Sequence, residues 1–409
     1  MKSNDMNKIK LIITHPSQLF ERWIKYYCMD ELAQVFDLEY WDCSSIVTPS
    51  YIVPNPLSRP YLRVIHSIKE FETKISELPK DTVLITEVYQ CAENYKFHKT
   101  QSKYFPNVLH FNFYGNIITH IDLDETSTID TVPKPRKKHN SIKSILYKSD
   151  IIRALIKWIF HPKGRNFIQL YLDGKCRQLY SQHTEISCVK SDSQRINHPD
   201  FETYLSIKNE PRLIPHKYAV FIDTFFPYHS ESYLGEVIPS NIDEIAQKYY
   251  ESLNTYFQQV KSKLGVPVVI AAHPYANYKE NNPFENREVF YYQTARLIKD
   301  CEAVCIHGSN AFSYVALYDK PVEVIINSAI KGTYFGNAAE LTAAKLHLPI
   351  YDTDKSLTVV PSFEKISNEL RVKYIDKYLG DINTQKSNKE LLIEYINAFY
   401  IQSRNYLKK

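Results

Sequence analysis

The chain has 409 residues, of which 44% are hydrophobic, and its formal net charge at pH 7 is +4. This length accommodates two ordinary domains with a sizeable core each, and the composition excludes a largely disordered protein. The small net charge and the lack of a recognised nucleic-acid module argue against nucleic acid as a partner. No apolar run is long enough to cross a membrane and the first residues lack a signal-peptide pattern, so we expect a cytoplasmic protein.

Glycine and cysteine narrow the choice of cofactor. Only nine glycines are present, and none forms the spacing of a dinucleotide-binding or Walker phosphate loop. The seven cysteines are scattered without a C-x-x-C pair, so neither a disulfide framework nor a zinc site is predicted. We therefore expect no bound metal or other cofactor, and a phosphate site would have to use helix ends, serines and basic side chains.

The first half alternates short apolar runs with helical patterns. Strands are predicted at residues 8–14, 37–41, 82–87 and 108–114, and helices at residues 19–27 and 61–78. Such βα alternation is typical of a parallel sheet with helices on its faces. The first strand is followed by His15-Pro16, and His15 is a candidate for the acceptor side of an active site, although a structural role is the alternative.

A basic segment and two D-x-D triplets each have a functional and a purely structural interpretation. Residues 134–165 hold ten Lys or Arg against one acid, Asp150, with an apolar complement. They can form an amphipathic helix at the inner face of the cell membrane, or a domain helix with a solvated basic face. The triplets Asp122-Leu123-Asp124 and Asp352-Thr353-Asp354 can hold a divalent metal against a nucleotide diphosphate, but we favour solvated loops and predict no metal ligand.

The second half repeats the strand and helix alternation after a Pro-containing connection at residues 211–216. Strands are predicted at residues 218–222, 266–272, 303–306 and 322–326, and a short strand at 185–189 precedes the connection. Helices are predicted at residues 241–264, 338–346 and 388–406, with one of about a dozen residues before residue 303. We expect a first domain over residues 1–210, a second over 217–385 and a closing C-terminal helix over 386–409.

Polar residues follow three strands of the second domain. Asp223 follows the first, His273-Pro274 the second and His307-Gly308-Ser309 the third. Ligands of open α/β sheets bind beyond the carboxyl ends of the strands, so these residues should approach one site. Ser309 and Asn310 are predicted to open a helix, whose first-turn N–H groups suit a phosphate. The alternative is that Ser309 only caps its helix and His273 only satisfies backbone groups.

These residues carry a resemblance. Residues 218–223 with Pro227-Tyr228-His229, then Ala272-His273-Pro274, Arg287, residues 294–298, His307-Gly308-Ser309 and Ser313 resemble bacterial glycosyltransferases of capsule and lipopolysaccharide assembly, and more distantly bacterial sialyltransferases. The resemblance implies the GT-B architecture, an α/β fold of two Rossmann-like parallel-sheet domains facing a cleft, with the sugar donor on the C-terminal domain and the acceptor on the N-terminal one.

The resemblance also implies roles for individual residues. Asp223 would be the catalytic base, and His273 would contact the leaving phosphate or protonate it. The donor-binding set would comprise His273, Pro274, Arg287, Thr294, His307, Gly308, Ser309, Asn310 and Ser313.

The resemblance further implies a reaction. We expect an inverting, metal-independent transfer of a CMP-activated nonulosonic acid or Kdo to a surface glycan or glycolipid. Two alternatives stay open: a sugar-nucleotide epimerase or hydrolase of the same fold, and a non-catalytic scaffold of a membrane-bound assembly complex.

Overall fold

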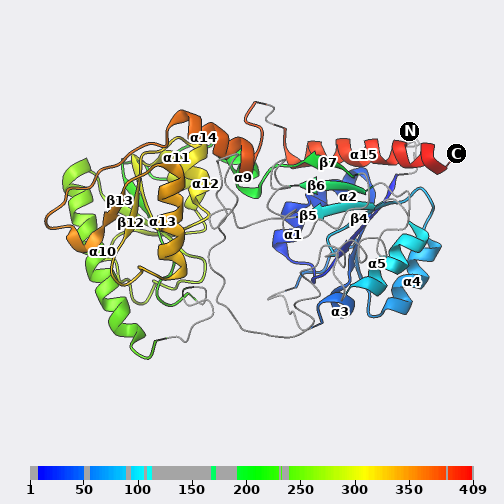
Figure 1. The fold of residues 1–409 in the computed structure, drawn as a ribbon, viewed down its shortest axis with the longest axis horizontal. Helices are drawn as coiled ribbons and strands as arrows, with labels where there is room; N and C mark the ends of the chain where they lie inside the picture. The colour runs from blue at the N-terminus through cyan, green and yellow to red at the C-terminus, as the bar shows by residue number, and fades with distance from the viewer. Residues whose placement is uncertain are drawn as a thin grey trace, which may run out of the picture. The chain divides into compact units, whose positions relative to one another are not determined.

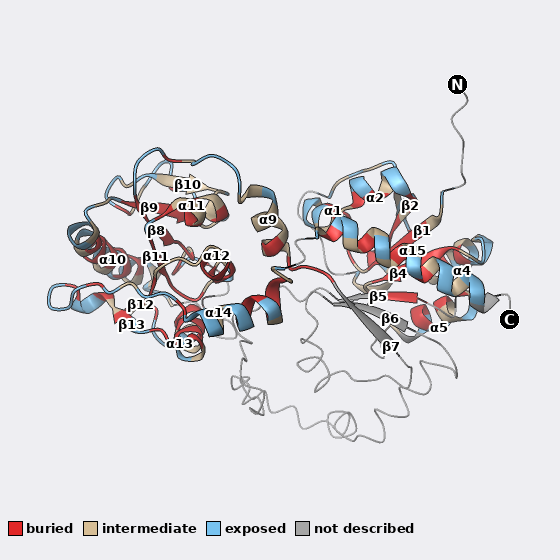
Figure 2. Ribbon diagram, turned by 90° about the horizontal axis from the view of Figure 1, so that it is seen from above, coloured by how far each residue is buried: buried red, intermediate tan, exposed pale blue. Residues whose placement is uncertain are grey.

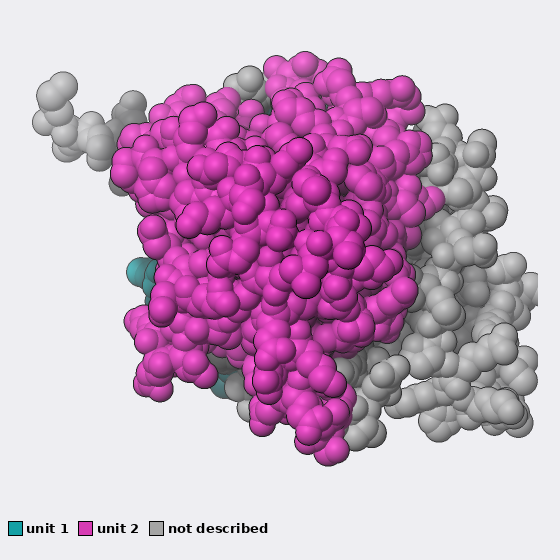
Figure 3. Space-filling view, turned by 90° about the vertical axis from the view of Figure 1, so that its left-hand side faces the viewer, with its two compact units in different colours: residues 1–113, 138–197, 384–409 teal, residues 114–137, 198–383 magenta. Residues whose placement is uncertain are grey.

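A computed structural model describes residues 8–49, 56–88, 94–105, 108–112, 167–171, 191–229, 232, 239–383 and 386–407. The chain divides into two compact units, coloured separately in Figure 3. Unit 1 comprises residues 1–113, 138–197 and 384–409, and unit 2 comprises residues 114–137 and 198–383. Residues 198–210 therefore group with the second unit and the C-terminal helix with the first, which differs from the boundaries expected from the sequence.

Unit 1 is built on a seven-stranded sheet in which every pairing is parallel. In sheet order its strands are β3 (Leu62–Val64), β2 (Asp37–Asp42), β1 (Lys10–His15), β4 (Val83–Thr86), β5 (Val108–Asn112), β6 (Phe167–Tyr171) and β7 (Ser191–Arg195). The chain order changes direction between β1 and β4, which creates a topological switch point there. Five of the six residues of β1 are buried, as expected for a strand covered by helices on both faces.

The helices of unit 1 pack their apolar sides on this sheet. They are α1 (Glu21–Tyr26), α2 (Met29–Val35), α3 (Ser44–Val47), α4 (Ile68–Glu77), α5 (Tyr95–Tyr104) and α15 (Asn388–Leu407). Helix α4 starts where the Ser67 hydroxyl accepts a hydrogen bond from the Glu70 amide, a standard N-cap. Its Phe71 stacks on Phe97 of α5 with ring centroids 4.4 Å apart, within a buried cluster that includes Trp41 of β2.

Unit 2 contains a six-stranded sheet, again with parallel pairings throughout. In sheet order its strands are β10 (Val289–Tyr291), β9 (Val268–Ala272), β8 (Ala219–Ile222), β11 (Ala303–Ile306), β12 (Val322–Ile326) and β13 (Ile350–Asp352). Here the switch point lies between β8 and β11. Strands β8, β9, β11 and β12 are buried over their full length and form the centre of the core.

Helices cover both faces of the second sheet (Figure 1), and Figure 2 shows buried strands beneath the exposed outer sides of α10 and α14. They are α9 (Pro199–Ile207), α10 (Ile242–Leu264), α11 (Thr294–Asp300), α12 (Phe312–Leu317), α13 (Tyr334–Leu346) and α14 (Asn368–Tyr374), with a 3-10 turn η3 (Thr353–Lys355) and a π-helical turn η4 (Ile375–Leu379). Helix α10 ends at Gly265, whose φ of +68° suits glycine at a helix C-terminus.

The predicted fold class is confirmed: both units are Rossmann-like, with helices around a parallel sheet, as in GT-B proteins. Two predicted helices are shorter than expected because an edge strand takes part of their length. The helix predicted at 61–78 begins only at Ile68, because residues 62–64 form the edge strand β3. The helix predicted before residue 303 is only seven residues long, because Val289, Phe290 and Tyr291 extend as edge strand β10. The predicted strand at 185–189, Asp122, Asp124 and the basic segment 134–165 lie outside the described residues.

Candidate functional site

His273 and Asp223 lie at the carboxyl ends of two neighbouring strands, β9 and β8, as the sequence predicted. Asp223 is only 3% exposed, and both its oxygens are occupied. One accepts a hydrogen bond from the Phe225 amide at 2.9 Å, and the other accepts from the His273 amide at 3.2 Å and the Tyr278 hydroxyl at 2.9 Å. Burial raises the pKa of Asp223 despite these donors. Asp223 holds the turns that follow β8 and β9, and its expected role as the base stays a prediction.

The His273 side chain is half-buried and has a defined tautomer. Its Nδ1 accepts a hydrogen bond from the Tyr275 amide at 3.2 Å, so the neutral ring carries its proton on Nε2. The ring meets His229 edge-on at 4.7 Å. Burial, with the charge of His229, lowers the pKa of His273 to about 4. At neutral pH His273 is thus an uncharged N–H donor at the ligand-binding edge of the sheet.

His307 does not face this edge, contrary to the prediction. It is fully buried, its Nδ1 lies 2.6 Å from the Ile325 carbonyl, and its Nε2 lies 2.9 Å from the Tyr249 hydroxyl. Burial lowers the pKa of His307 to about 4. The imidazole joins α10 to the central strands and is a structural residue.

The segment after His307 is also structural for the most part. A Cβ on Gly308 would lie 2.5 Å from both the Ala338 Cβ and the Phe335 carbonyl oxygen, so glycine lets α13 approach the end of β11. The expected helix start at Ser309 is corrected, because α12 begins at Phe312 and has six residues. Ala311 occupies its N-cap position without a side-chain cap. Ser309 closes the preceding turn by accepting from the Ala311 amide at 3.3 Å, and Asn310 beside it is exposed.

Ser313 and Arg287 are held by packing and hydrogen bonds, whereas Thr294 lies near the carboxyl end of β10. Ser313 is completely buried, beside Tyr374. The Arg287 guanidinium donates to the Asn254 side chain at 2.7 Å and the Phe284 carbonyl at 2.9 Å, and it lies over the Phe257 ring. It therefore anchors a loop to α10. Thr294 is the first residue of α11, beyond edge strand β10. Of this set, Pro274 remains exposed directly beside His273.

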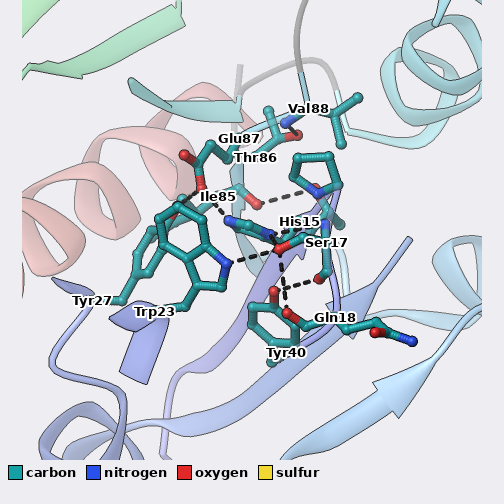
Figure 4. A network of polar contacts seen from close by, with 12 residues as sticks. His15, Ser17, Gln18, Trp23, Tyr27, Tyr40, Ile85, Thr86, Glu87 and Val88 are labelled. Atoms are coloured by element: carbon teal, nitrogen blue, oxygen red, sulfur yellow. Dashed lines mark hydrogen bonds and ion pairs between the residues drawn. The ribbon is translucent and has the colours of Figure 1, made fainter. Parts of the chain in front are cut away.

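A second polar cluster lies at the switch point of unit 1 (Figure 4). His15 ends β1 and Glu87 follows β4, and these strands pair with Thr14 opposite Thr86. Nε2 of His15 contacts Oε2 of Glu87, and the Tyr27 hydroxyl donates to the same oxygen. The Tyr27 hydroxyl and the His15 ring thus meet at one carboxylate oxygen, at the place where ligands of such sheets bind.

The other side of the His15 ring fixes its tautomer. The Ser17 amide donates to Nδ1 at 3.1 Å, and the indole N–H of Trp23 donates to the Ser17 hydroxyl at 2.7 Å. His15 is packed among aromatic rings, with Tyr40 stacked at 5.4 Å. Because Nδ1 accepts, the neutral ring has its proton on Nε2, directed at Glu87.

The accessible member of this cluster is Glu87. Its side chain is 12% exposed, whereas that of His15 is 1% exposed. His15 itself is buried and contacts Glu87, and its place on the acceptor side stays a prediction. Sequence reasoning missed Glu87 although it ends the predicted strand at 82–87, because the sequence does not say that β4 lies beside β1.

The described residues contain no group of three or more His, Cys, Asp or Glu side chains that could hold a metal ion. The second D-x-D triplet has a local role: Asp352 accepts from the Asp354 amide at 3.1 Å, and Asp354 accepts from the Ser252 hydroxyl at 2.7 Å and the Ser328 amide at 2.8 Å. This triplet caps η3 and ties it to α10. No helix among the described segments has the length and apolar composition to span a membrane.

The sequence matches no family model. It also matches no curated protein. Three solved structures align along most of the chain. The wall teichoic acid polymerase TagF has a TM-score of 0.45 and 8% identity over 99% of this chain and 92% of its own. An α/β-galactoside α-2,3-sialyltransferase from Photobacterium phosphoreum has a TM-score of 0.41 and 10% identity over 85% and 99%. The glycosyltransferase SnogD from Streptomyces nogalater has a TM-score of 0.36 and 11% identity over 98% and 99%. The fold class follows from the two parallel sheets themselves.

Proposed function

We propose that the protein is a glycosyltransferase that transfers a sugar from a nucleotide donor to a glycan or glycolipid. The donor that we favour is a CMP-linked nonulosonic acid or Kdo, used in an inverting reaction that needs no metal. Unit 2 would bind the nucleotide and unit 1 the acceptor. The observation that carries this proposal is His273: a half-buried imidazole at the carboxyl edge of a Rossmann-like sheet, with its tautomer fixed by the Tyr275 amide.

The role of His273 follows from this geometry. Its Nε2–H can donate a hydrogen bond to an oxygen of the leaving phosphate, where negative charge develops during transfer. A preorganised donor at such a place contributes about 10²–10³ in rate. Because the pKa of His273 is lowered to about 4, the residue acts as a neutral hydrogen-bond donor, not as an imidazolium that gives up its proton.

Inversion also requires a base that takes the proton of the acceptor hydroxyl. We assign this role to Glu87 in place of Asp223, because Glu87 is the partly exposed carboxylate of the two. The Tyr27 hydroxyl donates to one of its oxygens and the His15 ring contacts the same oxygen, which holds the carboxylate in place. General-base catalysis of this kind contributes about 10²–10⁴ in rate.

The test is a thermal-shift titration with CMP, UDP, GDP and their common sugar conjugates, with and without magnesium. A ligand at a hundred times its dissociation constant stabilises the fold by about 2.7 kcal/mol. We expect stabilisation by CMP without magnesium, lost in His273→Ala and kept in the control His216→Ala, whose histidine is on the surface of the same unit.

Other outcomes redirect the proposal. A response only to UDP or GDP with magnesium would reject the CMP assignment and direct attention to Asp122 and Asp124. No response to any nucleotide would favour the scaffold. Conversion of the sugar nucleotide without an acceptor would identify an epimerase or hydrolase instead of a transferase.

A further inference from the structure

The strongly exposed aromatic side chains of the described chain are confined to one edge of unit 2. They are Tyr228, Tyr275 and Tyr292, which are 44%, 73% and 76% exposed. Each follows the carboxyl end of one of three neighbouring parallel strands, β8, β9 and β10. The rings therefore gather at the ligand-binding edge of the sheet, on both sides of His273. Exposed aromatic surface concentrated in one place indicates a binding site.

Tyr275 is held directly against the histidine pair. Its amide donates to His273 Nδ1, and its ring centroid is 5.1 Å from that of His273. One face of the Tyr275 ring stacks on His229 at 5.8 Å with an interplanar angle of 19°. With 73% of the residue exposed, the ring also presents open surface to solvent. The Tyr275 ring is therefore a flat surface, supported by His229, beside the His273 imidazole that we assign to the phosphate.

Tyr292 lies on the next strand end and is tied to the same turn. The last residue of β10, Tyr291, is in register with Ala272, the residue before His273. The Tyr292 hydroxyl donates to the Pro274 carbonyl at 3.4 Å. Tyr228 differs from these two, because its hydroxyl is bonded to Asp243 on α10 and it is the least exposed of the three.

Backbone strain accompanies this arrangement. Tyr292 has φ of +58° and Phe225 has φ of +56°, a left-handed conformation that bulky residues rarely adopt. Residues in such strained conformations occur at ligand clamps. The Phe225 ring is parallel to His273 at 6.4 Å. The strained aromatic residues thus lie on either side of the His273 turn.

We propose that Tyr275, with Tyr292 beside it, forms the stacking surface for the nucleobase of the sugar donor. The inference rests on the proposed function and names the part of the ligand that these rings bind. A nucleotide joins an anionic group to a flat aromatic ring, and this edge offers an N–H donor for the first and an open tyrosine face for the second. Stacking on an aromatic side chain is worth about 1–3 kcal/mol per base and tolerates different bases.

The test compares ligands that share or lack the base. Binding of CMP, cytidine and ribose 5-phosphate is measured by calorimetry for the wild type, Tyr275→Ala and Tyr275→Phe. We expect Tyr275→Ala to weaken the affinity for CMP and cytidine about 5- to 150-fold and to leave the affinity for ribose 5-phosphate unchanged. Tyr275→Phe should stay within about twofold of the wild type, and Tyr292→Ala should show a smaller loss of the same kind. Leu357→Ala, at a residue of the same unit that is 83% exposed, is the control. If another nucleotide binds more tightly, the same comparison uses that nucleotide and its nucleoside.

Several outcomes would overturn the inference. If Tyr275→Ala weakens the binding of CMP and ribose 5-phosphate equally, or weakens neither, base stacking is excluded. A raised acceptor KM with unchanged CMP affinity would assign the rings to a sugar of the acceptor, and a wild-type dimer that Tyr275→Ala dissociates would assign them to a second copy. If the wild type binds nucleotide and only His273→Ala abolishes binding, the inference fails and the proposed function stands. If the wild type binds no nucleotide, both fail.

Discussion

The two sheets have equivalent switch points, between β1 and β4 in unit 1 and between β8 and β11 in unit 2. At the first, Glu87 presents a partly exposed carboxylate supported by His15 and Tyr27. At the second, Asp223 and His307 are both buried and fully hydrogen-bonded. In unit 2 the accessible group lies one strand further along, at His273. Topology thus determines which edge of a sheet can bind a ligand, whereas side-chain packing determines which residue at that edge is accessible to it.

Glu87→Gln gives the sharpest test of the unit 1 cluster. The amide has the shape of the carboxylate but cannot take a proton, so we expect the turnover rate to fall by about 10²–10⁴. Nucleotide binding should be unchanged, because unit 2 keeps all its contacts. The measurement is nucleotide release in the presence of acceptor, with the nucleotide-induced thermal shift recorded for the same variant.

The matched control is Glu39→Gln. Glu39 is another half-buried carboxylate of unit 1, paired with Lys10 and the Trp41 indole. Its replacement should leave turnover near the wild-type level. Equal rates in Glu87→Gln and the wild type would remove Glu87 from the mechanism and leave the cluster a structural role.

Gly308→Ala tests whether the unit 2 switch point is closed by packing. The added methyl group would meet the Ala338 Cβ, the Phe335 carbonyl oxygen and the Ala339 amide nitrogen at 2.5, 2.5 and 2.9 Å. Since two of these are backbone atoms, α13 must move, and overpacking of this kind costs about 1–3 kcal/mol of unfolding free energy. The loss is measured by denaturant unfolding, with Ser309→Ala as a neighbour that should cost less than about 1.5 kcal/mol. Unchanged stability in Gly308→Ala would show that the end of β11 is open enough to bind a ligand.

The sequence predicted the sheets and the position of His273 because these depend on local pattern. Apolar runs such as residues 268–272 form buried parallel strands, and the His-Pro that ends this run marks the carboxyl edge. The buried position of His307 depends on hydrogen-bond partners that are distant in sequence. Tyr249 and Ile325 supply its hydrogen bonds, and no local pattern reveals that α10 covers the end of β11.

The same limit applies to the two carboxylates. Asp223 follows a predicted strand and Glu87 ends one, so local pattern cannot rank them. Asp223 is occupied because the Tyr278 hydroxyl, 55 residues along the chain, reaches its second oxygen. Glu87 is partly open because its neighbour β1 supplies a histidine that leaves one side of the carboxylate accessible. Strand order and loop packing, which are properties of the folded chain, decide between them.

The smallest expected effect concerns pH, and it separates a neutral His273 from a cationic one. With the pKa of His273 lowered from 6.5 to about 4, its charge does not change at and above about pH 5.5. The ratio of nucleotide affinities between the wild type and His273→Ala should then be constant from about pH 5.5 to 8. The ligand is the sugar conjugate, because its phosphodiester does not ionise in this range, whereas a free phosphate monoester ionises near pH 6. An imidazole with an ordinary pKa would become cationic as the pH falls through about 6.5, and the wild-type advantage would grow there.

The pH dependence of the unfolding free energy gives an independent measure of the pKa of His273. Below about pH 6.5 the histidine of the unfolded chain binds a proton that the folded protein does not accept until about pH 4. The wild type should therefore lose stability relative to His273→Ala as the pH falls across this range. Constant affinity ratios together with this loss would establish that unit 2 binds phosphate through a neutral donor. A rising affinity ratio without the loss would show instead that His273 titrates with an ordinary pKa in the folded protein and binds phosphate as a cation.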